Sequence, residues 1–155
     1  MTTPVQPLWW EEIEQGQSFA FGSKQITRDE IIRFASEFDP QPFHVDEEAA
    51  RSNPMFGRLC ASGVHLFAIT SRLIFDGFMQ HGIHPLGGGG VEKMRFLNPV
   101  FPDDMLHLTL TIMSTRPLKS RADRGLVEIE SRLTNQHGTD VLSKLGIFFM
   151  QRRPA

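Results

Sequence analysis

The second half of the chain is organised by a regular alternation of apolar and polar residues. The alternation runs through 106–112, 127–133 and 145–150. A period of two predicts β-strands, because successive side chains of a strand point to opposite faces. The breaks at 119–125 and 135–138 are polar and end in glycine, which is typical of hairpin turns. These residues therefore predict a run of antiparallel strands.

A helix is predicted where the first short strand ends. Thr27 can accept a hydrogen bond from the backbone N–H of Glu30 while the Glu30 carboxylate reaches back, which is a capping box. Two prolines then end the helix, so 39–45 is expected to be a constrained loop before a short helix over 46–52 capped by Asp46. Three apolar residues share one face of the first helix: Ile31, Ala35 and Phe38.

A longer helix with apolar residues on most sides follows. Ser62 can cap it, and the apolar run continues to about Phe75. A helix that is apolar all round is buried, so other elements must surround it. The later strands, with further strands expected over 17–26 and over 90–98, supply that cover. We therefore predict an α+β fold in which one antiparallel sheet curls around one long central helix.

Composition and charge fit a single domain of this kind. The chain has 155 residues and a formal net charge of -2, which argues against a nucleic-acid partner. We expect 1–16 to form an irregular arm whose tryptophans pack onto a domain over 17–155. The first residues do not resemble a secretion signal, and no apolar run reaches the ~18 residues that span a bilayer. We therefore expect a soluble cytoplasmic protein without a membrane partner.

The predicted loop over 39–45 carries the clearest candidate chemistry. Asp39 and His44 flank two prolines, which restrict the backbone and hold the loop in one shape. A carboxylate and an imidazole held rigidly together suit general acid–base catalysis. The alternative is structural: Asp39 caps a turn and His44 is a hydrogen-bonded loop residue.

The residues around this loop resemble the signature of the MaoC-like, R-specific enoyl-thioester hydratases. The stretch over 34–46 reads FASEFDPQPFHVD, and a second stretch over 91–104, VEKMRFLNPVFPDD, is similar to a later passage of the family. The chain departs from the signature at Phe38, where the family often has glycine, and at Gln41, where it has asparagine. Four signature positions are in register: Asp39, Pro42, His44 and Asp46.

The resemblance implies the hotdog fold, in which subunits pair as homodimers with the active site near their interface. It also implies hydration of a trans-2-enoyl thioester to a 3-hydroxyacyl thioester, or the reverse dehydration. Asp39 and His44 would hold one water and share the proton transfers. The N–H of Gly63, at the start of the central helix, would stabilise the enolate oxygen. No metal or cofactor is implied, because the coenzyme A of an acyl-CoA is part of the substrate.

Four further residues are assigned to substrate binding on the same resemblance. Ser62 stands where the family often has histidine, and Gln41 where it has asparagine. Ser71 aligns with a serine that shapes the family's site, although a serine that bonds back within its own helix is an equal alternative. Arg95 is the candidate for the phosphates of coenzyme A, because guanidinium groups suit phosphate.

Two other functions are compatible with this fold. A hotdog thioesterase needs a carboxylate on the central helix, and no Asp or Glu lies between Ser62 and Phe75. A non-catalytic subunit that binds acyl thioesters would not need both Asp39 and His44. Three weaker features have structural explanations that we favour: His81 with His84 as metal ligands, Cys60 with His65 as a nucleophile and base, and the glycines 87–90 as a phosphate loop.

Overall fold

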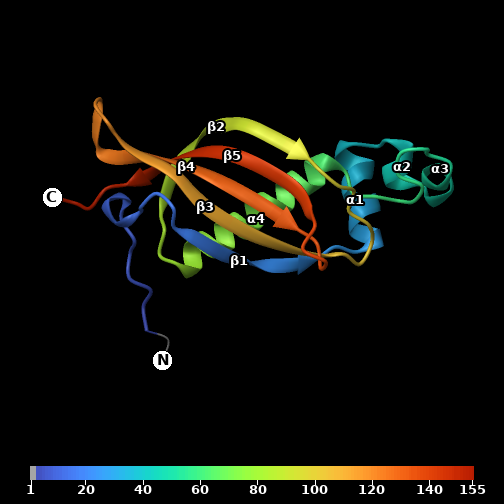
Figure 1. The fold of residues 1–155 in the computed structure, drawn as a ribbon, viewed down its shortest axis with the longest axis horizontal. Helices are drawn as coiled ribbons and strands as arrows, with labels where there is room; N and C mark the ends of the chain where they lie inside the picture. Colours follow the sequence, from blue (N-terminus) through green and yellow to red (C-terminus); the bar gives the residue numbers. More distant parts are fainter. Residues whose placement is uncertain (1–2) are drawn as a thin grey trace.

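A computed structural model describes residues 3–155 and confirms the predicted α+β class. The strands form one antiparallel sheet in the order β1-β3-β4-β5-β2 (Figure 1). The strands span β1 (Ser18–Gln25), β2 (Pro85–Phe96), β3 (Met105–Leu118), β4 (Arg121–Thr134) and β5 (Asp140–Gln151). The helices are the 3-10 turn η1 (Trp10–Glu12), α1 (Arg28–Phe38), α2 (Pro42–Val45), α3 (Glu47–Arg51) and α4 (Gly63–Gln80).

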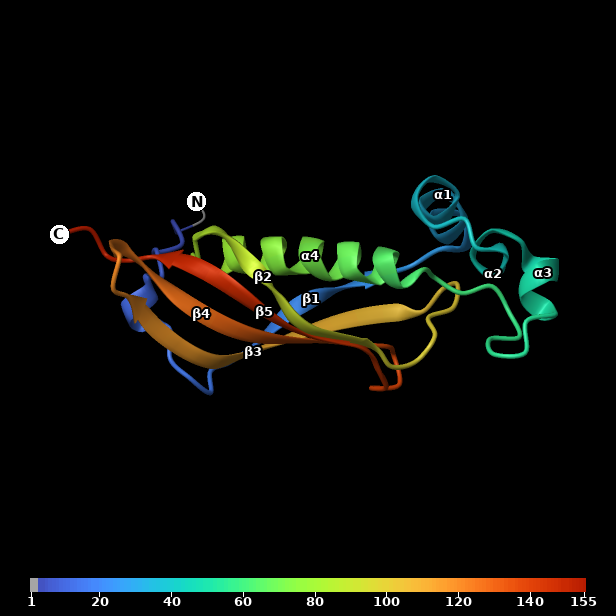
Figure 2. The ribbon, with the colours of Figure 1, turned by 90° about the horizontal axis from the view of Figure 1, so that it is seen from above.

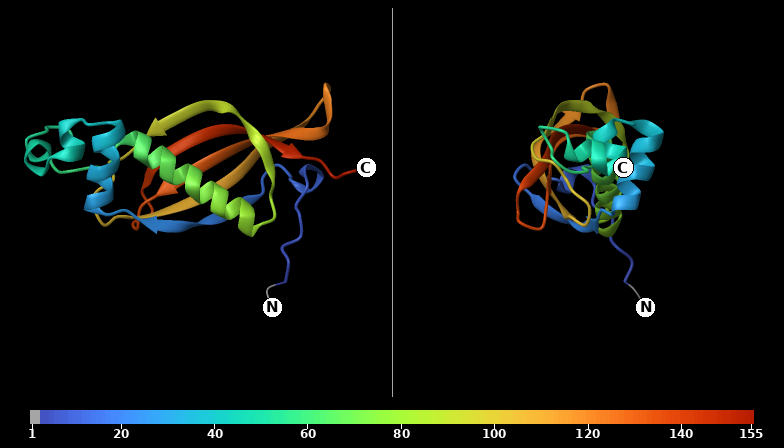
Figure 3. Two further views of the ribbon diagram at one scale, coloured as in Figure 1. Left: turned by 180° about the vertical axis from the view of Figure 1, so that it is seen from behind. Right: turned by 90° about the vertical axis from the view of Figure 1, so that its right-hand side faces the viewer.

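The long helix α4 lies along one face of the curved sheet, as the hotdog fold requires (Figure 2). Seen from behind, α4 crosses in front of the strands, while α1, α2 and α3 gather beyond its first turn (Figure 3). The core fills the space between α4 and the sheet. Its members include Leu66, Ile69, Leu73 and Phe78 of the helix and Leu106, Leu108, Ile129 and Leu133 of the strands.

The predicted helix starts are confirmed. Thr27 and Glu30 form the capping box of α1. The Asp46 carboxylate accepts from the first N–H groups of α3. The Ser62 hydroxyl accepts from the N–H of Val64 in α4. Each of these contacts spans at most three residues, which is why the sequence alone reveals them.

Several predicted boundaries are wrong. The stretch over 39–45 is not all loop, because Pro42 opens the short helix α2 at a position where its missing N–H costs nothing. The central helix runs beyond Phe75 to Gln80. Within this extension Gly77 packs directly beneath the Phe21 ring, where a Cβ would clash with the ring.

Strand boundaries also differ from the prediction. β2 begins at Pro85 rather than at residue 90, so the four glycines lie within the strand. The first hairpin turn is confined to Lys119 and Ser120, because β3 and β4 remain paired almost to the tip. In β5 both alternating sets are apolar, and the set that faces α4 comprises Leu142, Lys144, Gly146, Phe148 and Met150. The pattern alone did not decide between the two faces.

The central helix is not surrounded on all sides in a single chain. Val64 and Phe75 on α4 are 51% and 57% exposed, and Phe38, predicted to be on the buried face of α1, is 62% exposed. The edge strand β2 is exposed along most of its length. In the segment expected to form the N-terminal arm, of which residues 1 and 2 lie outside the described part, the Trp10 indole donates to the Leu126 carbonyl. None of the described helices is long and apolar enough to cross a membrane.

Candidate active site

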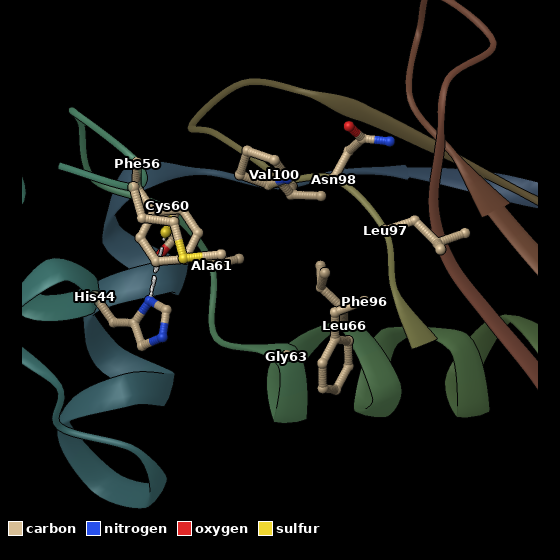
Figure 4. Close-up of a pocket in the computed structure, with 12 residues that line it drawn as sticks. His44, Phe56, Cys60, Ala61, Gly63, Leu66, Phe96, Leu97, Asn98 and Val100 are labelled. Atoms are coloured by element: carbon tan, nitrogen blue, oxygen red, sulfur yellow. Dashed lines mark hydrogen bonds between the residues drawn. The ribbon is translucent and has the colours of Figure 1, made fainter. Parts of the chain in front are cut away.

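A pocket of about 300 Å³ opens beside the first turn of α4 (Figure 4). One wall comes from the segment that leads into α4, another from α4 itself and a third from the end of β2. Most of the lining is apolar, and His44 brings an ionisable side chain to it. The lining residues are His44, Met55, Phe56, Cys60, Ala61, Gly63, Leu66, Phe96, Leu97, Asn98, Pro99 and Val100.

Asp39 and His44 meet beside this pocket, which His44 lines and Asp39 does not, because two short elements turn the chain back on itself. Asp39 caps the C-terminus of α1, and Pro42 starts α2, which carries His44. The Nε2 atom of His44 lies 3.7 Å from Oδ2 of Asp39. His44 is 6% exposed, while about a quarter of the Asp39 side chain reaches solvent. A pair in this position can hold and deprotonate a small polar molecule.

The orientation of His44 is set by a backbone contact that sequence reasoning missed. Its Nδ1 lies 2.6 Å from the carbonyl oxygen of Cys60. A carbonyl only accepts, so Nδ1 must carry the hydrogen, and in neutral imidazole this leaves Nε2 as a free acceptor facing Asp39. Figure 4 shows this contact as the dashed line from His44.

Cys60 does not have the character of a nucleophile. Burial raises the pKa of its thiol to about 11, so the reactive thiolate is scarce near neutral pH. Its sulfur lies 3.7 Å from Nδ1 of His44. His65, the base considered for it, stacks instead on the Phe34 ring at 4.3 Å. Burial lowers the pKa of His65 to about 4.

Ser62 joins the candidate acid–base pair to the central helix. Its hydroxyl donates to Oδ2 of Asp39 at 2.6 Å and accepts from the N–H of Val64 at 3.2 Å. Ser62 itself is fully buried, while the Asp39 carboxylate that it contacts is partly exposed to solvent. Ser62 therefore has two roles: it caps α4 and it holds the Asp39 carboxylate.

Gly63 supplies an N–H at the start of α4. It is the first helical residue, and among residues 3–155 no hydrogen-bond acceptor is found for this N–H. First-turn N–H groups have no partner within a helix and carry its positive dipole end. The Phe96 ring covers Gly63 so closely that a Cβ would lie 2.6 Å from it. Only glycine fits this spot without moving the ring.

The other predicted substrate-binding residues lie outside the pocket of this single chain. Gln41 is exposed and contributes mainly backbone, accepting from the N–H of His44 at 2.9 Å. Ser71 lies two turns further along α4 and is exposed. Arg95 is exposed on β2. Within the described part of the chain, no cluster of three metal-ligating side chains occurs.

The pocket residues from β2 were not identified from the sequence. Phe96 ends β2, and Leu97 and Asn98 follow it directly; all three lie more than thirty positions after Gly63 in the chain. The available signal was the family-like passage over 91–104, which marks this strand without showing which side chains face the helix. The buried Lys144 on β5 was also missed.

Comparison with known proteins gives consistent results. The family described as MaoC like domain matches residues 12–133. Protein YdeM of Bacillus subtilis (strain 168) is 37% identical over 127 residues, which cover 81% of this chain and 86% of YdeM. Protein MaoC of Klebsiella aerogenes is 30% identical over 105 residues, and the match spans only 30% of that longer protein.

Solved structures agree in fold. The MaoC-like dehydratase from Rhodospirillum rubrum superposes with a TM-score of 0.84 at 39% identity, covering 96% of this chain and 99% of that one. The R-hydratase PhaJ1 from Pseudomonas aeruginosa has a TM-score of 0.71 at 25% identity, covering 96% and 89%. The chain belongs to the MaoC-like domain family.

Proposed function

We propose that this protein adds water to trans-2-enoyl thioesters, giving 3-hydroxyacyl thioesters, or catalyses the reverse dehydration. The observation that carries the proposal is the Asp39–His44 pair, whose facing atoms lie 3.7 Å apart at a largely apolar pocket beside the free N–H of Gly63. An acid–base pair and an oxyanion donor are the groups that this reaction needs. The names of its relatives, a MaoC-like dehydratase and an R-hydratase, support the same reaction class.

In the proposed reaction the pair binds one water between the Asp39 carboxylate and Nε2 of His44. The water oxygen bonds to C3 while its proton passes to the pair, and the electrons of the C2–C3 double bond move onto the thioester oxygen. The Gly63 N–H stabilises this enolate oxygen. The enolate then collapses, and C2 takes up a proton from the pair. Because the two groups are coupled, their proton work belongs to the pair and not to either residue.

A thioesterase is less well supported by the same site. Such an enzyme would use a carboxylate on the central helix near the thioester. The acidic residue on α4 is Asp76, three turns beyond Gly63, and it is held by Arg72 at 3.0 Å. A non-catalytic binding subunit would have no use for a histidine oriented by Cys60 toward a carboxylate.

We also propose that two copies of the chain pair through β2 and the open side of α4. β2 is the edge of the sheet, and it exposes Leu86, Val91 and Met94, while α4 exposes Val64 and Phe75. An open edge strand beside exposed apolar residues favours association. Light scattering should give at least twice the 17.6 kDa of one chain. A single-chain mass at micromolar concentration would contradict the pairing.

The proposed substrates are acyl-CoA or other acyl thioesters of fatty acid metabolism, and the proposed location is the cytoplasm, where a lone free cysteine stays reduced. Arg95 remains the proposed contact for coenzyme A phosphates. Because it lies on β2 outside the pocket of its own chain, it would act from the paired edge.

The test uses a panel of trans-2-enoyl-CoA esters and the loss of absorbance of the conjugated thioester. Asp39→Asn and His44→Asn should each remove most of kcat, and the double variant should lose little more, because residues that act as a unit are not additive. Asp29→Asn, which removes an exposed carboxylate from α1, is the matched control and should keep full activity. Additive losses, or no hydration of any chain length, would refute the proposal.

A further inference from the structure

Lys144 is a buried cation that the proposed reaction does not use. It lies on β5 and faces α4, with 6% of its surface exposed. Its Nζ sits 4.8 Å from the centre of the Phe67 ring. Among residues 3–155 no carboxylate lies within ion-pair distance of Lys144, and burial lowers the pKa of its amine. An ammonium group in such a place is costly unless an anion or a ring offsets the lost hydration.

A buried polar side chain without a hydrogen-bond partner lies on the neighbouring strand. Ser131 on β4 is the register partner of Lys144, so the two side chains share the face that packs on α4. Ser131 is fully buried, and its hydroxyl has no hydrogen-bond partner in the described structure. Buried hydroxyls are normally paired, and an unpaired one calls for an explanation. The ammonium and the hydroxyl form a donor pair on one face of the sheet, and no hydrogen bond or ion pair to another side chain is found for either within residues 3–155.

This donor pair does not line the pocket and lies beyond it along the central helix. Phe67, which Lys144 contacts, is one helical turn beyond Gly63 on the same side of α4, a rise of about 6 Å. On the sheet, Lys144 is two residues beyond Leu142, the register partner of Phe96, and the Phe96 ring covers Gly63. The helix and the sheet therefore both place Lys144 beyond the expected position of the thioester carbonyl, toward the C-terminal end of α4.

We propose that Lys144 and Ser131 bind a carboxylate at the far end of the acyl chain, so that the preferred substrate is the monothioester of a short unsaturated dicarboxylic acid. The inference rests on the proposed hydratase function and names its substrate class. A carboxylate accepts from both an ammonium and a hydroxyl, and such charge-assisted bonds are the strong ones. An extended chain advances about 1.2 Å per bond, so the ~6 Å from Gly63 corresponds to an acyl group of about six carbons.

The experiment compares two substrates of equal length, the CoA monothioester of trans-2-hexenedioic acid and trans-2-hexenoyl-CoA. Wild-type protein should show the higher kcat/KM with the dicarboxylic substrate. Lys144→Met, which keeps the length of the side chain and removes its charge, should lower the ratio of the two kcat/KM values by about 10- to 100-fold. Ser131→Ala should lower the ratio by a smaller factor, and Lys144→Arg should restore part of it.

Binding is measured in parallel by calorimetry with adipoyl-CoA and hexanoyl-CoA, which are saturated and do not react. This arm separates the two proposals: tight Lys144-dependent binding of adipoyl-CoA without hydration of any enoyl-CoA would sink the function but keep the carboxylate site. Lys119→Met, at the exposed tip of the first hairpin, removes an equal charge and should leave the ratio unchanged.

Circular dichroism confirms that each variant is folded, and Ser131→Ala serves alone if Lys144→Met does not fold. The inference is overturned if wild type binds and hydrates the neutral substrate as well as the dicarboxylic one, or if Lys144→Met and Ser131→Ala leave the ratio unchanged. Either result would show that the cation is satisfied by the Phe67 ring or by a second copy of the chain.

Discussion

Removal of the Ser62 hydroxyl should damage catalysis and stability by separable amounts. The hydroxyl makes two contacts, donating to Asp39 and accepting from Val64. Loss of an N-cap typically costs ~1 kcal/mol when alanine replaces serine and only a few tenths when glycine does. A hydrogen bond to a charged group contributes ~1.5–3 kcal/mol. Because a quarter of the Asp39 side chain is exposed to water, the lower figure applies.

Ser62→Ala should therefore destabilise the fold by ~2.5 kcal/mol and Ser62→Gly by ~1.5–2 kcal/mol. In a domain of this size these losses correspond to a fall in Tm of about 5–10 °C and about 3–8 °C. Both variants lose the contact that holds the Asp39 carboxylate. Both should thus lose about tenfold in kcat, since ~1.4 kcal/mol is a factor of ten, while KM changes little.

The assay is hydration of an enoyl-CoA substrate by wild type and the two variants, with thermal unfolding measured on the same samples. Ser62→Thr keeps a hydroxyl at this position and should recover much of kcat. If Ser62→Gly turned over as fast as wild type while Ser62→Ala did not, the serine would act only as a helix cap. The positioning role toward Asp39 would then be refuted.

Three other outcomes can be measured on the same preparation. Gly63→Ala should fold and lose some activity because its methyl displaces the exposed Phe96 ring, whereas Gly63→Pro also deletes the N–H and should lose far more kcat; equal turnover would place the oxyanion elsewhere. Burial lowers the pKa of His65 to about 4, so the stability gained by keeping this histidine neutral is complete above pH 6.5 and is lost as the pH falls toward 4. The loss in the free energy of unfolding is roughly 3 kcal/mol. His65→Phe should flatten the dependence of this free energy on pH between 6.5 and 4, and an unchanged slope would contradict the reasoning. Ser71→Ala should alter KM or chain-length preference more than kcat, and a collapse of kcat would make Ser71 catalytic.

Local contacts explain which parts of the fold were predictable. The capping box of Thr27 and Glu30 and the cap at Asp46 depend on neighbouring residues, so the sequence shows them directly. The end of α4 also has a local signal: Gly82 has a φ of +69°, and the N–H of Ile83 donates to the Phe78 carbonyl at 2.9 Å. The predicted helix was too short because Asp76 and Gly77 interrupt the apolar run before this signal is reached.

The candidate site, too, was predictable where its residues are close in the sequence and not where they come from distant elements. The rigid spacing of Asp39 and His44 on one short segment predicted that they could act together, and the structure places them 3.7 Å apart, with His44 lining the pocket. The inward face of β5 was not predictable, because both alternating sets of residues are apolar, and Lys144 was hidden in one of them. Its burial becomes visible only when β4 and α4 are placed beside it.

The extended segment 60–62 and Gly63, the first residue of α4, hold each part of the candidate site in place. The Cys60 carbonyl orients His44, and the N–H of Ala61 is tied to the Val100 carbonyl at 2.8 Å. Ser62 then binds the Asp39 carboxylate, and Gly63 presents its free N–H. Consecutive residues of an extended chain keep a fixed spacing. The distance between the acid–base pair and the oxyanion donor is therefore set by the backbone, so a substrate that fits one is aligned with the other.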